Sequence, residues 1–491
     1  MKKIHGAVAA LCGTLMMAGS MQAMADSTDD IVHALIGKGV LTEEEGALLL
    51  KGRAGEKEAA DEKKKNAVGV KYKDGIVIGT EDGKNSLQIN GRVHLDYRGY
   101  SYEEDDDGSA ALSSTGSDTF DVRRARLGAK FRFLDYYSGE VVANLAGSEG
   151  ADLDVAYLNV AWWEPVQFRF GQFKMPFSLE QLTSSNNIDF VERSFVDAYI
   201  PAKEIGAMVH GAPFKGTTYG LALSTGRGIN SAENDVRVDD VDIIGRVTAN
   251  FAEIMGNQNM VMHVGAAFSD GDISKGDGNA AFGGNRRTEA RGATFFTAPV
   301  VSSLFTTSDA SIDRTRVGLE SALAYGPFKL QGQWVQTGFD FETAADDYDA
   351  DVKAWYAEAL WTITGESWAD RYKGGAFGGI KPKTNFDPRT FTGGAWEVGV
   401  RYSSLDAGDF NTPGLSAGAG LDPQITTGAS RYAEADAWTM GLKFIPNPHV
   451  RFMLDYVDTD FEENFGGTVV TVNGEDEEDE KALLFRAQVA F

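Results

Sequence analysis

The chain has 491 residues, and its 72 acidic and 46 basic side chains give a formal net charge of −26. After residue 25, no apolar run approaches the ~18 to 20 residues that a membrane helix needs, so a helical membrane protein is excluded. With 57 glycines and 11% aromatic residues, the chain is also too long for one ordinary soluble domain. Two classes remain: several soluble domains, or one large β architecture.

Residues 1–25 have the features of a secretory signal peptide. Lys2 and Lys3 precede the apolar run AVAALCGTLMMAG, and a small-x-small cleavage site, AMA, follows. Cleavage removes Cys12, the single cysteine, so we expect neither disulfides nor thiol chemistry in the mature chain. The net charge of the mature chain is then about −28, because two lysines are lost.

Residues 26–65 favour helices. DDIVHALIGKGVL has apolar residues at helical spacing, and Thr42 with Glu45 forms a capping-box pattern at a helix start. Gly37 and Gly39 separate the two expected helices. The charge run EKEAADEKKK is expected to be a solvated linker, and the alternative is a small helical element that associates between subunits in the periplasm.

From about Ser86 onward the period of hydrophobicity becomes two. In VDIIGRVTANF the apolar residues share one face and the polar residues share the other, as in a β-strand with one face toward water and the other toward an apolar environment. About sixteen such segments follow, each of roughly the ten residues that a tilted transmembrane strand needs. The last, ALLFRAQVAF, ends on an aromatic residue, as barrel proteins of the outer membrane do.

The connections alternate between short links and long polar loops, the asymmetry of an outer-membrane barrel. The long segment of residues 365–394 falls among the short links, so it is a candidate for folding back into the lumen. We therefore expect an all-β fold, a 16-stranded antiparallel transmembrane β-barrel over residues 66–491 with inward-folded loops and a short N-terminal helical segment. A soluble sandwich or multidomain protein is the alternative. The apolar faces of its strands would have to pack against one another in buried cores, and nothing in the sequence divides the chain into domains.

The stretch FDVRRARLGAKFRF, residues 120–133, concentrates basic charge in this acidic chain. A charge facing lipid costs ~2 to 4 kcal/mol at mid-depth, so charged residues on the strands must face the lumen. Residue parity then places four cations in a row along the pore and assigns Arg123 to the odd-numbered, lipid-facing side near the rim. The four are Arg124, Arg126, Lys130 and Arg132.

Parity places other strand charges in the lumen as well, whereas most acids lie in loops such as EEDDD, DDYDAD and EDEEDE. The lumenal bases are Arg92, Arg169, Arg246, Arg316, Lys329, Arg401, Lys443, Arg451 and Arg486, and the lumenal acids are Asp96, Glu140, Glu320, Glu358, Glu397 and Asp455. Arginine forks bind phosphate or carboxylate through paired hydrogen bonds, so a basic lumen predicts an anion pathway. The alternative is that these charges pair across strands and only maintain the barrel's shape.

Two long loops are expected to narrow the pore, since a sixteen-strand barrel is otherwise wide. The loop MPFSLEQLTSSNNIDFVERSFVDAYIPAKE is aromatic enough to pack inside, and it carries Lys174, Arg193 and Lys203. The second loop, residues 269–313, contains a basic cluster that could instead be exposed. That cluster is Arg286, Arg287 and Arg291.

Several of these motifs resemble the phosphate-selective porins of Gram-negative outer membranes. They are INGRVHLDY, VRRARLG, FRFGQFKMPFSLEQLTSS, FVERS, WTITGES, GAWEVGVRYS and the closing aromatic strand. The resemblance implies a homotrimeric, sixteen-stranded porin whose arginine/lysine ladder passes phosphate or related oxyanions. Its neighbours would be outer-membrane lipid and lipopolysaccharide, and no cofactor, metal or nucleic acid is expected. Arg92, Arg124, Arg169 and Arg193 match basic positions of the family, while the second loop matches only as a basic cluster.

Other functions stay open beside this one. The acidic GFDFETAADDYDAD stands where phosphate-specific members place lysines, which favours a general diffusion porin. An outer-membrane enzyme is a further alternative, although no histidine of the mature chain sits in a nucleophile or HExxH motif, so no catalytic residue is expected. A structural or adhesive barrel with cation-binding acidic loops is the last, but EEDDD and EDEEDE lack the spacing of an ordered calcium loop.

Overall fold

The computed structural model of the chain describes residues 27–65, 67–102, 116–146, 150–226, 228–229, 241–274, 285–297, 311–342, 347–411, 432–464, 471–472, 475–476 and 479–491. The chain divides into two compact units, and each is described by itself: Met1–Gly69 with Gly79–Gly83, and Val70–Ile78 with Lys84–Phe491. No helix in the described ranges is long and apolar enough to cross a membrane.

The first unit contains a helical hairpin of α1 (Ser27–Gly37) and α2 (Glu43–Lys65). Gly39 turns the chain between the helices with φ +67°, and Thr42 caps α2. The Thr42 amide donates to Glu45 Oε2 at 2.9 Å, and the Glu45 amide donates to Thr42 Oγ1 at 3.2 Å, which confirms the predicted capping box. The run EKEAADEKKK, expected to be a solvated linker, is helical, because α2 continues through it; alanine, glutamate and lysine are strong helix formers.

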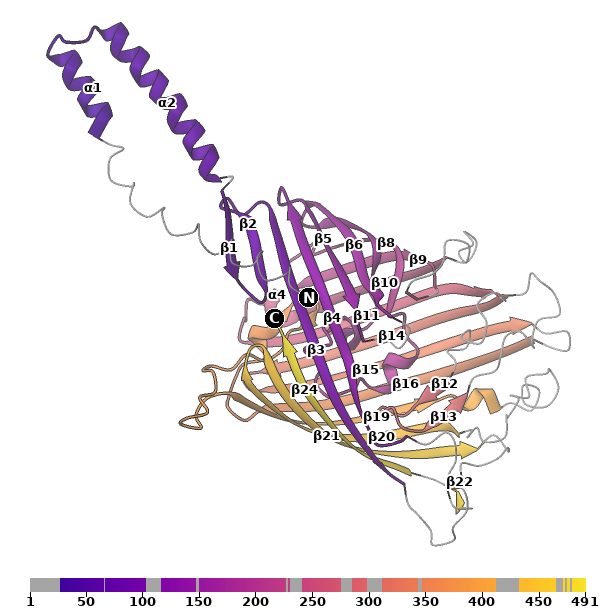
Figure 1. The fold of residues 1–491 in the computed structure, drawn as a ribbon. Coiled ribbons are helices and arrows are strands. Elements are labelled where there is room, and N and C mark those ends of the chain that lie inside the picture. The colour runs from indigo at the N-terminus through magenta and orange to yellow at the C-terminus, as the bar shows by residue number, and fades with distance from the viewer. Residues whose placement is uncertain are drawn as a thin grey trace, which may run out of the picture. The chain divides into compact units, whose positions relative to one another are not determined.

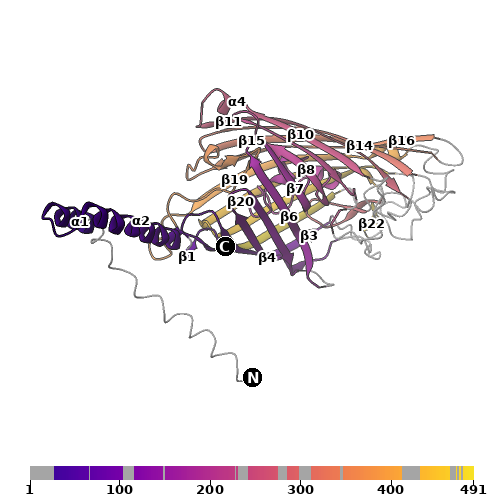
Figure 2. The same cartoon turned by 90° about the horizontal axis from the view of Figure 1, so that it is seen from above.

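The second unit is a closed barrel of sixteen antiparallel strands, as predicted (Figures 1 and 2). Each strand pairs with the next, and β24 pairs with β3 to close the wall, Arg486 opposite Asp96. The strands are β3 (Ser86–Ser101), β4 (Thr119–Phe133), β5 (Tyr137–Asn144), β6 (Asp152–Trp163), β7 (Val166–Lys174), β8 (Lys203–Gly211), β9 (Thr217–Ser224), β10 (Asp242–Asn250), β11 (Met260–Ser274), β14 (Ser311–Tyr325), β15 (Phe328–Glu342), β16 (Asp347–Thr362), β19 (Ala395–Asp406), β20 (Tyr432–Asn447), β21 (Val450–Asn464) and β24 (Asp479–Ala490).

Short elements lie before and between the barrel strands. They are β1 (Val68–Tyr72), β2 (Ile76–Thr80), α3 (Leu179–Leu182), η1 (Phe195–Ala198), α4 (Phe251–Ile254), β12 (Asn285–Arg287), β13 (Thr294–Thr297), η4 (Ala369–Arg371), β17 (Tyr372–Lys373), β18 (Ala376–Phe377), η5 (Gly408–Asn411), β22 (Thr471–Val472) and β23 (Glu475–Asp476). One end of the barrel, here called the short-turn end, carries tight turns such as residues 134–136, 164–165 and 326–327, and the other, the long-loop end, carries the long connections.

The two faces of the wall follow the alternation of the sequence. On β10, Ile243 and Val247 point outward and are 46% and 60% exposed, whereas Asp242 and Arg246 are buried inside. Outward aromatic side chains gather by the short turns, as in the girdle of a transmembrane barrel. They include Trp162, Trp163, Phe214, Tyr325, Phe328, Trp361 and Trp396. The exterior beside the short turns therefore suits lipid, and the charged groups of β10 lie in the lumen.

Candidate functional site

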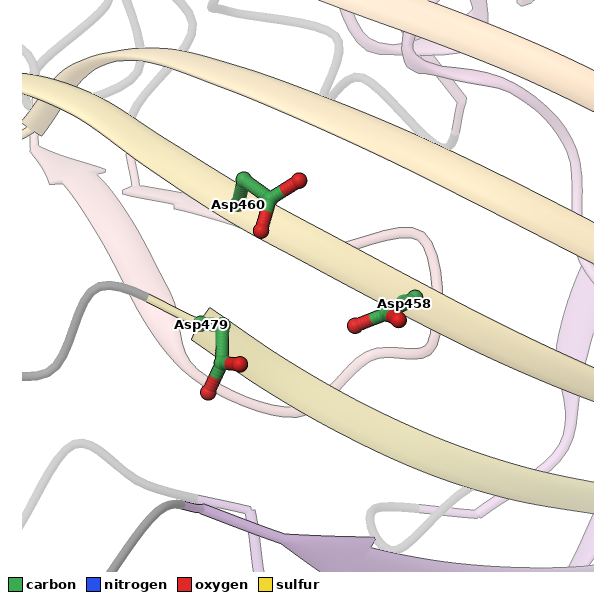
Figure 3. A group of neighbouring side chains, drawn as sticks. All are labelled: Asp458, Asp460 and Asp479. Atoms are coloured by element: carbon green, nitrogen blue, oxygen red, sulfur yellow. The ribbon is translucent and has the colours of Figure 1, made fainter.

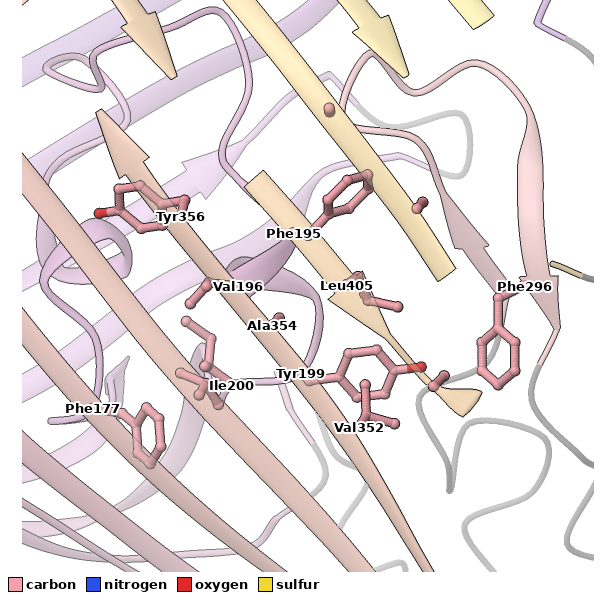
Figure 4. Close-up of a cluster of buried hydrophobic side chains, with 14 of the residues drawn as sticks. Phe177, Phe195, Val196, Tyr199, Ile200, Phe296, Val352, Ala354, Tyr356 and Leu405 are labelled. Atoms are coloured by element: carbon pink, nitrogen blue, oxygen red, sulfur yellow. The ribbon is translucent and has the colours of Figure 1, made fainter. Parts of the chain in front are cut away.

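The connection between β7 and β8, residues 175–202, folds into the lumen as predicted and is here called the constriction loop. Its apolar side chains pack on the inner faces of β16 and β19 and on β13, which explains why an aromatic loop does not stay in solvent (Figure 4). The packed residues include Phe177, Phe195, Val196, Tyr199, Ile200, Phe296, Val352, Ala354, Tyr356 and Leu405.

Lumenal charges satisfy the buried backbone of the constriction loop. Glu320 of β14 accepts the Leu179 amide at 2.8 Å, and Asp455 of β21 accepts the Val191 amide at 2.6 Å. Arg451 of β21 donates to a carbonyl oxygen of the loop at 2.6 Å. A buried backbone group without a partner costs free energy, so these contacts hold the loop across the barrel. Cross-strand pairs, the alternative expected from the sequence, also occur on this side of the lumen: Lys329 with Glu358 at 3.5 Å and Lys443 with Glu397 at 2.7 Å.

The opposite pattern surrounds a cavity of about 680 Å³, here called the basic cavity, between the constriction loop and the wall of β3 to β8. Eight cations and only two carboxylates line it, in a chain of net charge −26. The cations are Arg92, Arg124, Arg126, Lys130, Arg169, Lys174, Arg193 and Lys203, and the carboxylates are Glu140 and Asp154. Six of the ten predicted anion-pathway residues thus meet in one cavity, those six being Arg92, Arg124, Arg126, Lys130, Arg169 and Arg193.

Four of the eight cations are paired with carboxylates, and three of these pairs use the two acids of the cavity itself. Arg126 lies 2.9 Å from Asp154, and Lys203 contacts the same oxygen. Lys130, half-exposed, lies 3.7 Å from Glu140. These pairs account for both acids of the cavity.

The fourth paired cation is Arg193, 3.7 Å from Asp197 of the constriction loop, and the other four cations contact neutral groups. Arg92 donates to the Ser185 hydroxyl at 2.8 Å, and Arg124 lies 3.5 Å from the His94 ring. Arg169 stacks on the Tyr157 ring at 4.4 Å. Lys174, like Arg193, donates to the Thr183 carbonyl oxygen at the end of α3, at 2.9 and 3.2 Å respectively. The positive field of the cavity is therefore not cancelled from within.

A second, smaller cavity of about 350 Å³ shares Arg169, Lys174 and Leu182 with the basic cavity. It reaches Glu164 at a short turn, whereas the basic cavity reaches Gly228 at a long loop. The two cavities together follow the β3 to β10 wall from one end of the barrel toward the other.

Comparison with known proteins agrees with this geometry. The model of the family "Phosphate-selective porin O and P" matches residues 87–491. The chain belongs to this porin family. Porin O of Pseudomonas aeruginosa is 27% identical over 447 residues, 86% of this chain and 92% of that protein.

Solved porin structures resemble this porin with low sequence identity. OmpT of Vibrio cholerae is 11% identical, with a TM-score of 0.45 over 83% of this chain and 98% of that one. OmpF of Salmonella typhi in complex with daunomycin is 12% identical, with a TM-score of 0.44 over 86% of this chain and 100% of that one.

The remaining four predicted residues of the porin lie outside the basic cavity. Arg132 is exposed near a short turn, 3.9 Å from Asp135. Arg286 covers the Tyr199 ring at 4.3 Å, and Arg287 donates to the Gly292 carbonyl oxygen at 3.0 Å. The remaining residue, Arg291, adopts a left-handed backbone conformation with φ +64°. Arg286, Arg287 and Arg291 belong to one loop. Its described part, residues 285–297, packs inside against the constriction loop through the rings of Phe195 and Phe295.

The prediction that Arg123 faces lipid near the rim is wrong. The β3–β4 register shifts between His94 and Leu95, so that Arg123 is an extra residue between Val122 and Arg124. Such a bulge lets two successive side chains face the same side. Arg123 therefore turns inward beside Arg124 and contacts Glu192 of the constriction loop at 2.8 Å.

A second bulge explains an acid that sequence reasoning missed. The β5–β6 register shifts between Val142 and Ala143, and Asp154 is the extra residue. Asp154 and Val155 consequently both line the basic cavity. Lys174 and Lys203 were predicted only as charges carried by the loop, and their place in the cavity depends on how the loop enters and leaves it.

Acidic residues do gather at the long-loop end. Asp458, Asp460 and Asp479 place carboxylate oxygens within 4.8 Å of one another on β21 and β24 (Figure 3). Asp479 pairs with Lys481 at 2.6 Å, so the group belongs to a charged rim. Glu480, from the predicted solvated run EDEEDE, is instead buried and accepts the Thr288 hydroxyl at 2.6 Å.

Proposed function

We propose that the protein is a passive outer-membrane channel for small anions, with phosphate or a related oxyanion as the preferred solute. The observation that carries the proposal is the basic cavity, where eight cations meet two carboxylates and four of the cations contact neutral groups. A partly hydrated anion entering it would meet guanidinium forks, whose geometry suits paired hydrogen bonds to an oxyanion. Because flux requires release as well as entry, these contacts must be weak and several rather than one tight site.

The membrane setting completes the proposal. Residues 1–25 would direct export and be cleaved, the short-turn end would face the periplasm, and the long-loop end would face outside, toward lipopolysaccharide. Strands β5 and β7 to β10 have only eight or nine residues, at or below the ~9 to 11 that cross a bilayer. We propose that other copies cover this short wall in a homotrimer.

A general diffusion porin with little anion specificity is the second candidate function. It is favoured by the acids at the ends of β15 and β16, which lie on the outward face of the rim around the long-loop mouth. They include Asp340, Asp349 and Asp351. A negative mouth would attract cations and weaken selectivity.

Planar bilayer measurements test the two candidates. Under a KCl gradient the zero-current potential should report anion preference, and phosphate titrated into chloride should block conductance. In Arg124→Ala we expect about tenfold weaker phosphate block, since a hydrogen bond to a charged group is worth about 1.5 to 3 kcal/mol. The matched control is Arg132→Ala, outside the cavity, which should behave as wild type. Cation preference of the wild type contradicts the proposal, and anion preference without block favours the general porin.

A further inference from the structure

A second segment enters the lumen from the short-turn end. It comprises residues 363–394 and is here called the returning segment; its inner part folds inward, as the sequence led us to expect, with Trp368 and Phe377 buried. The constriction loop comes from the long-loop end. The two segments meet inside the barrel, where Leu179 of the loop belongs to the same buried cluster as Trp368 and Phe377.

Lys329 of β15 touches both segments at once, and its side chain is fully buried. Its ammonium lies 2.6 Å from Asp189 of the constriction loop and 3.5 Å from Glu358 of β16. On the other side it faces the rings of the returning segment, 4.6 Å from the centroid of Trp368 and 4.8 Å from that of Phe377. One cation thus joins a strand, the constriction loop and the returning segment.

This arrangement is stable only while both segments are inside. A buried ammonium needs a carboxylate partner, and aromatic faces stabilise it further when water is excluded. If either segment withdrew, Lys329 would lose one group of partners and water would enter. The position of each segment therefore depends on the other through this side chain.

Glu320 of β14 repeats the connection nearby. It accepts the Leu179 amide of the constriction loop at 2.8 Å and pairs with Arg246, which donates to the Gly375 carbonyl oxygen of the returning segment at 2.9 Å. His263 bridges Glu320 and Tyr372 of the returning segment, at 3.0 and 2.7 Å. The contacts lie on the wall of β10 to β16, whereas the basic cavity is lined from β3 to β8.

We propose that Lys329 is a positioning residue that latches the constriction loop to the returning segment, closes this part of the lumen, and so confines permeation to the basic cavity and the smaller cavity that continues it. Lys329 itself does not line that cavity or bind the permeating anion. Its effect on selectivity rests on the proposed function, the anion channel, while its effect on pore size does not.

The test compares Lys329→Met with a matched control, Lys443→Met. Lys443 is also a buried lumenal lysine, 2.7 Å from Glu397, but its second contact is the Ile188 carbonyl oxygen of the constriction loop. In Lys329→Met we expect at least about twofold higher single-channel conductance, uptake of neutral sugars by proteoliposomes, and weaker anion preference, because an unblocked sixteen-strand lumen is wide. Lys443→Met leaves the Lys329 contacts to both segments in place, so it should keep the sugar exclusion of the wild type and change conductance less than Lys329→Met.

Wild-type conductance and sugar exclusion in a correctly folded Lys329→Met barrel would overturn the proposal, as would equal changes in both variants. If Lys329→Met does not assemble, Asp189→Ala decides: it keeps the contacts to Glu358 and the rings but removes the loop's carboxylate. A smaller rise in conductance supports the latch, and none overturns it. A wild type without anion preference would refute the proposed function alone, since conductance and sugar uptake still judge the latch.

Discussion

Arg123 of β4 holds Glu192 of the constriction loop with both sides of its fork, Nε 2.8 Å from one carboxylate oxygen and a terminal nitrogen 3.2 Å from the other. Arg98 and Arg486 approach the same carboxylate at 3.5 and 3.3 Å. Burial by itself would raise the pKa of Glu192, but the guanidiniums of Arg123, Arg486 and Arg124 hold it well below its ordinary value. Glu192 is therefore an ionised anchor of the loop.

Replacing Glu192 by glutamine should lower the free energy of unfolding by about 3 to 5 kcal/mol, because buried guanidiniums lose their shared partner. Since the pKa is lowered, the stabilisation by Glu192 is present above the ordinary pKa of a glutamate and is lost only as pH falls through the lowered value. Urea unfolding in detergent at neutral pH measures it. Asp135→Asn, which removes the exposed partner of Arg132, is the control and should cost no more than about 0.5 kcal/mol.

Glu180 in the same loop should give the opposite dependence on pH. Burial is the main cause that raises its pKa to about 7, although Arg401 and the Ser194 amide oppose the rise. A raised folded pKa means that stability is full below the ordinary pKa of a glutamate and is lost as pH rises through about 7. We expect ionisation of Glu180 to make the free energy of unfolding up to about 3 kcal/mol lower at pH 8 than at pH 4.

Unfolding of wild type and Glu180→Gln across this pH range measures that difference. Glutamine at position 180 cannot ionise, so the variant should lose this part of the pH dependence and match the wild type best in acid. A variant with the same pH dependence as the wild type would show that Glu180 is not the titrating group.

The capping box of α2 predicts a local effect in the helical hairpin. Thr42→Ala removes the hydroxyl that accepts the Glu45 amide, and the expected cost to helix stability is about 1 kcal/mol. Circular dichroism of the isolated hairpin peptide would be too weak a test, since short helices are marginal in water. Hydrogen exchange in the full protein should show faster exchange of the first amides of α2 in the variant, with the barrel amides unchanged.

The strands, the inward constriction loop and most lumenal charges could be predicted from the sequence, because alternation with period two survives wherever one face meets lipid. Parity failed where a bulge adds a residue, and Arg123 and Asp154 both lie at such places. A bulge leaves no distinctive residue pattern here. The position of each bulge depends on the strand register that lets Arg123 reach Glu192 or Asp154 reach Arg126. The two residues of each pair are far apart in sequence.

Parity also does not predict how deeply a basic residue of the wall is buried. Arg124 and Arg132 share a strand face, yet the first is buried beside His94 and the second is exposed at a turn. Parity reports the direction of a side chain but not its depth. Depth depends on the constriction loop, which crosses the lumen where side chains such as Glu320 and Asp455 accept its amides.

Asp154 partly neutralises the positive charge of the basic cavity, because it pairs with Arg126 at 2.9 Å and also with Lys203. In Asp154→Asn both cations lose their counter-charge, and the field that concentrates anions becomes stronger. We expect the ratio of anion to cation permeability to rise by about threefold at low ionic strength, with a smaller rise at about 1 M salt, where the Debye length is short. Zero-current potentials measure it.

Glu140→Gln provides the comparison for that experiment. Glu140 lines the same cavity, but its partner Lys130 is half-exposed and 3.7 Å away, so water already screens the pair. Its removal should change selectivity less than removal of Asp154. An equal or larger effect of Glu140→Gln would mean that the anion's path is controlled near the short-turn end, and an unchanged ratio in Asp154→Asn would mean that permeating ions do not pass Arg126.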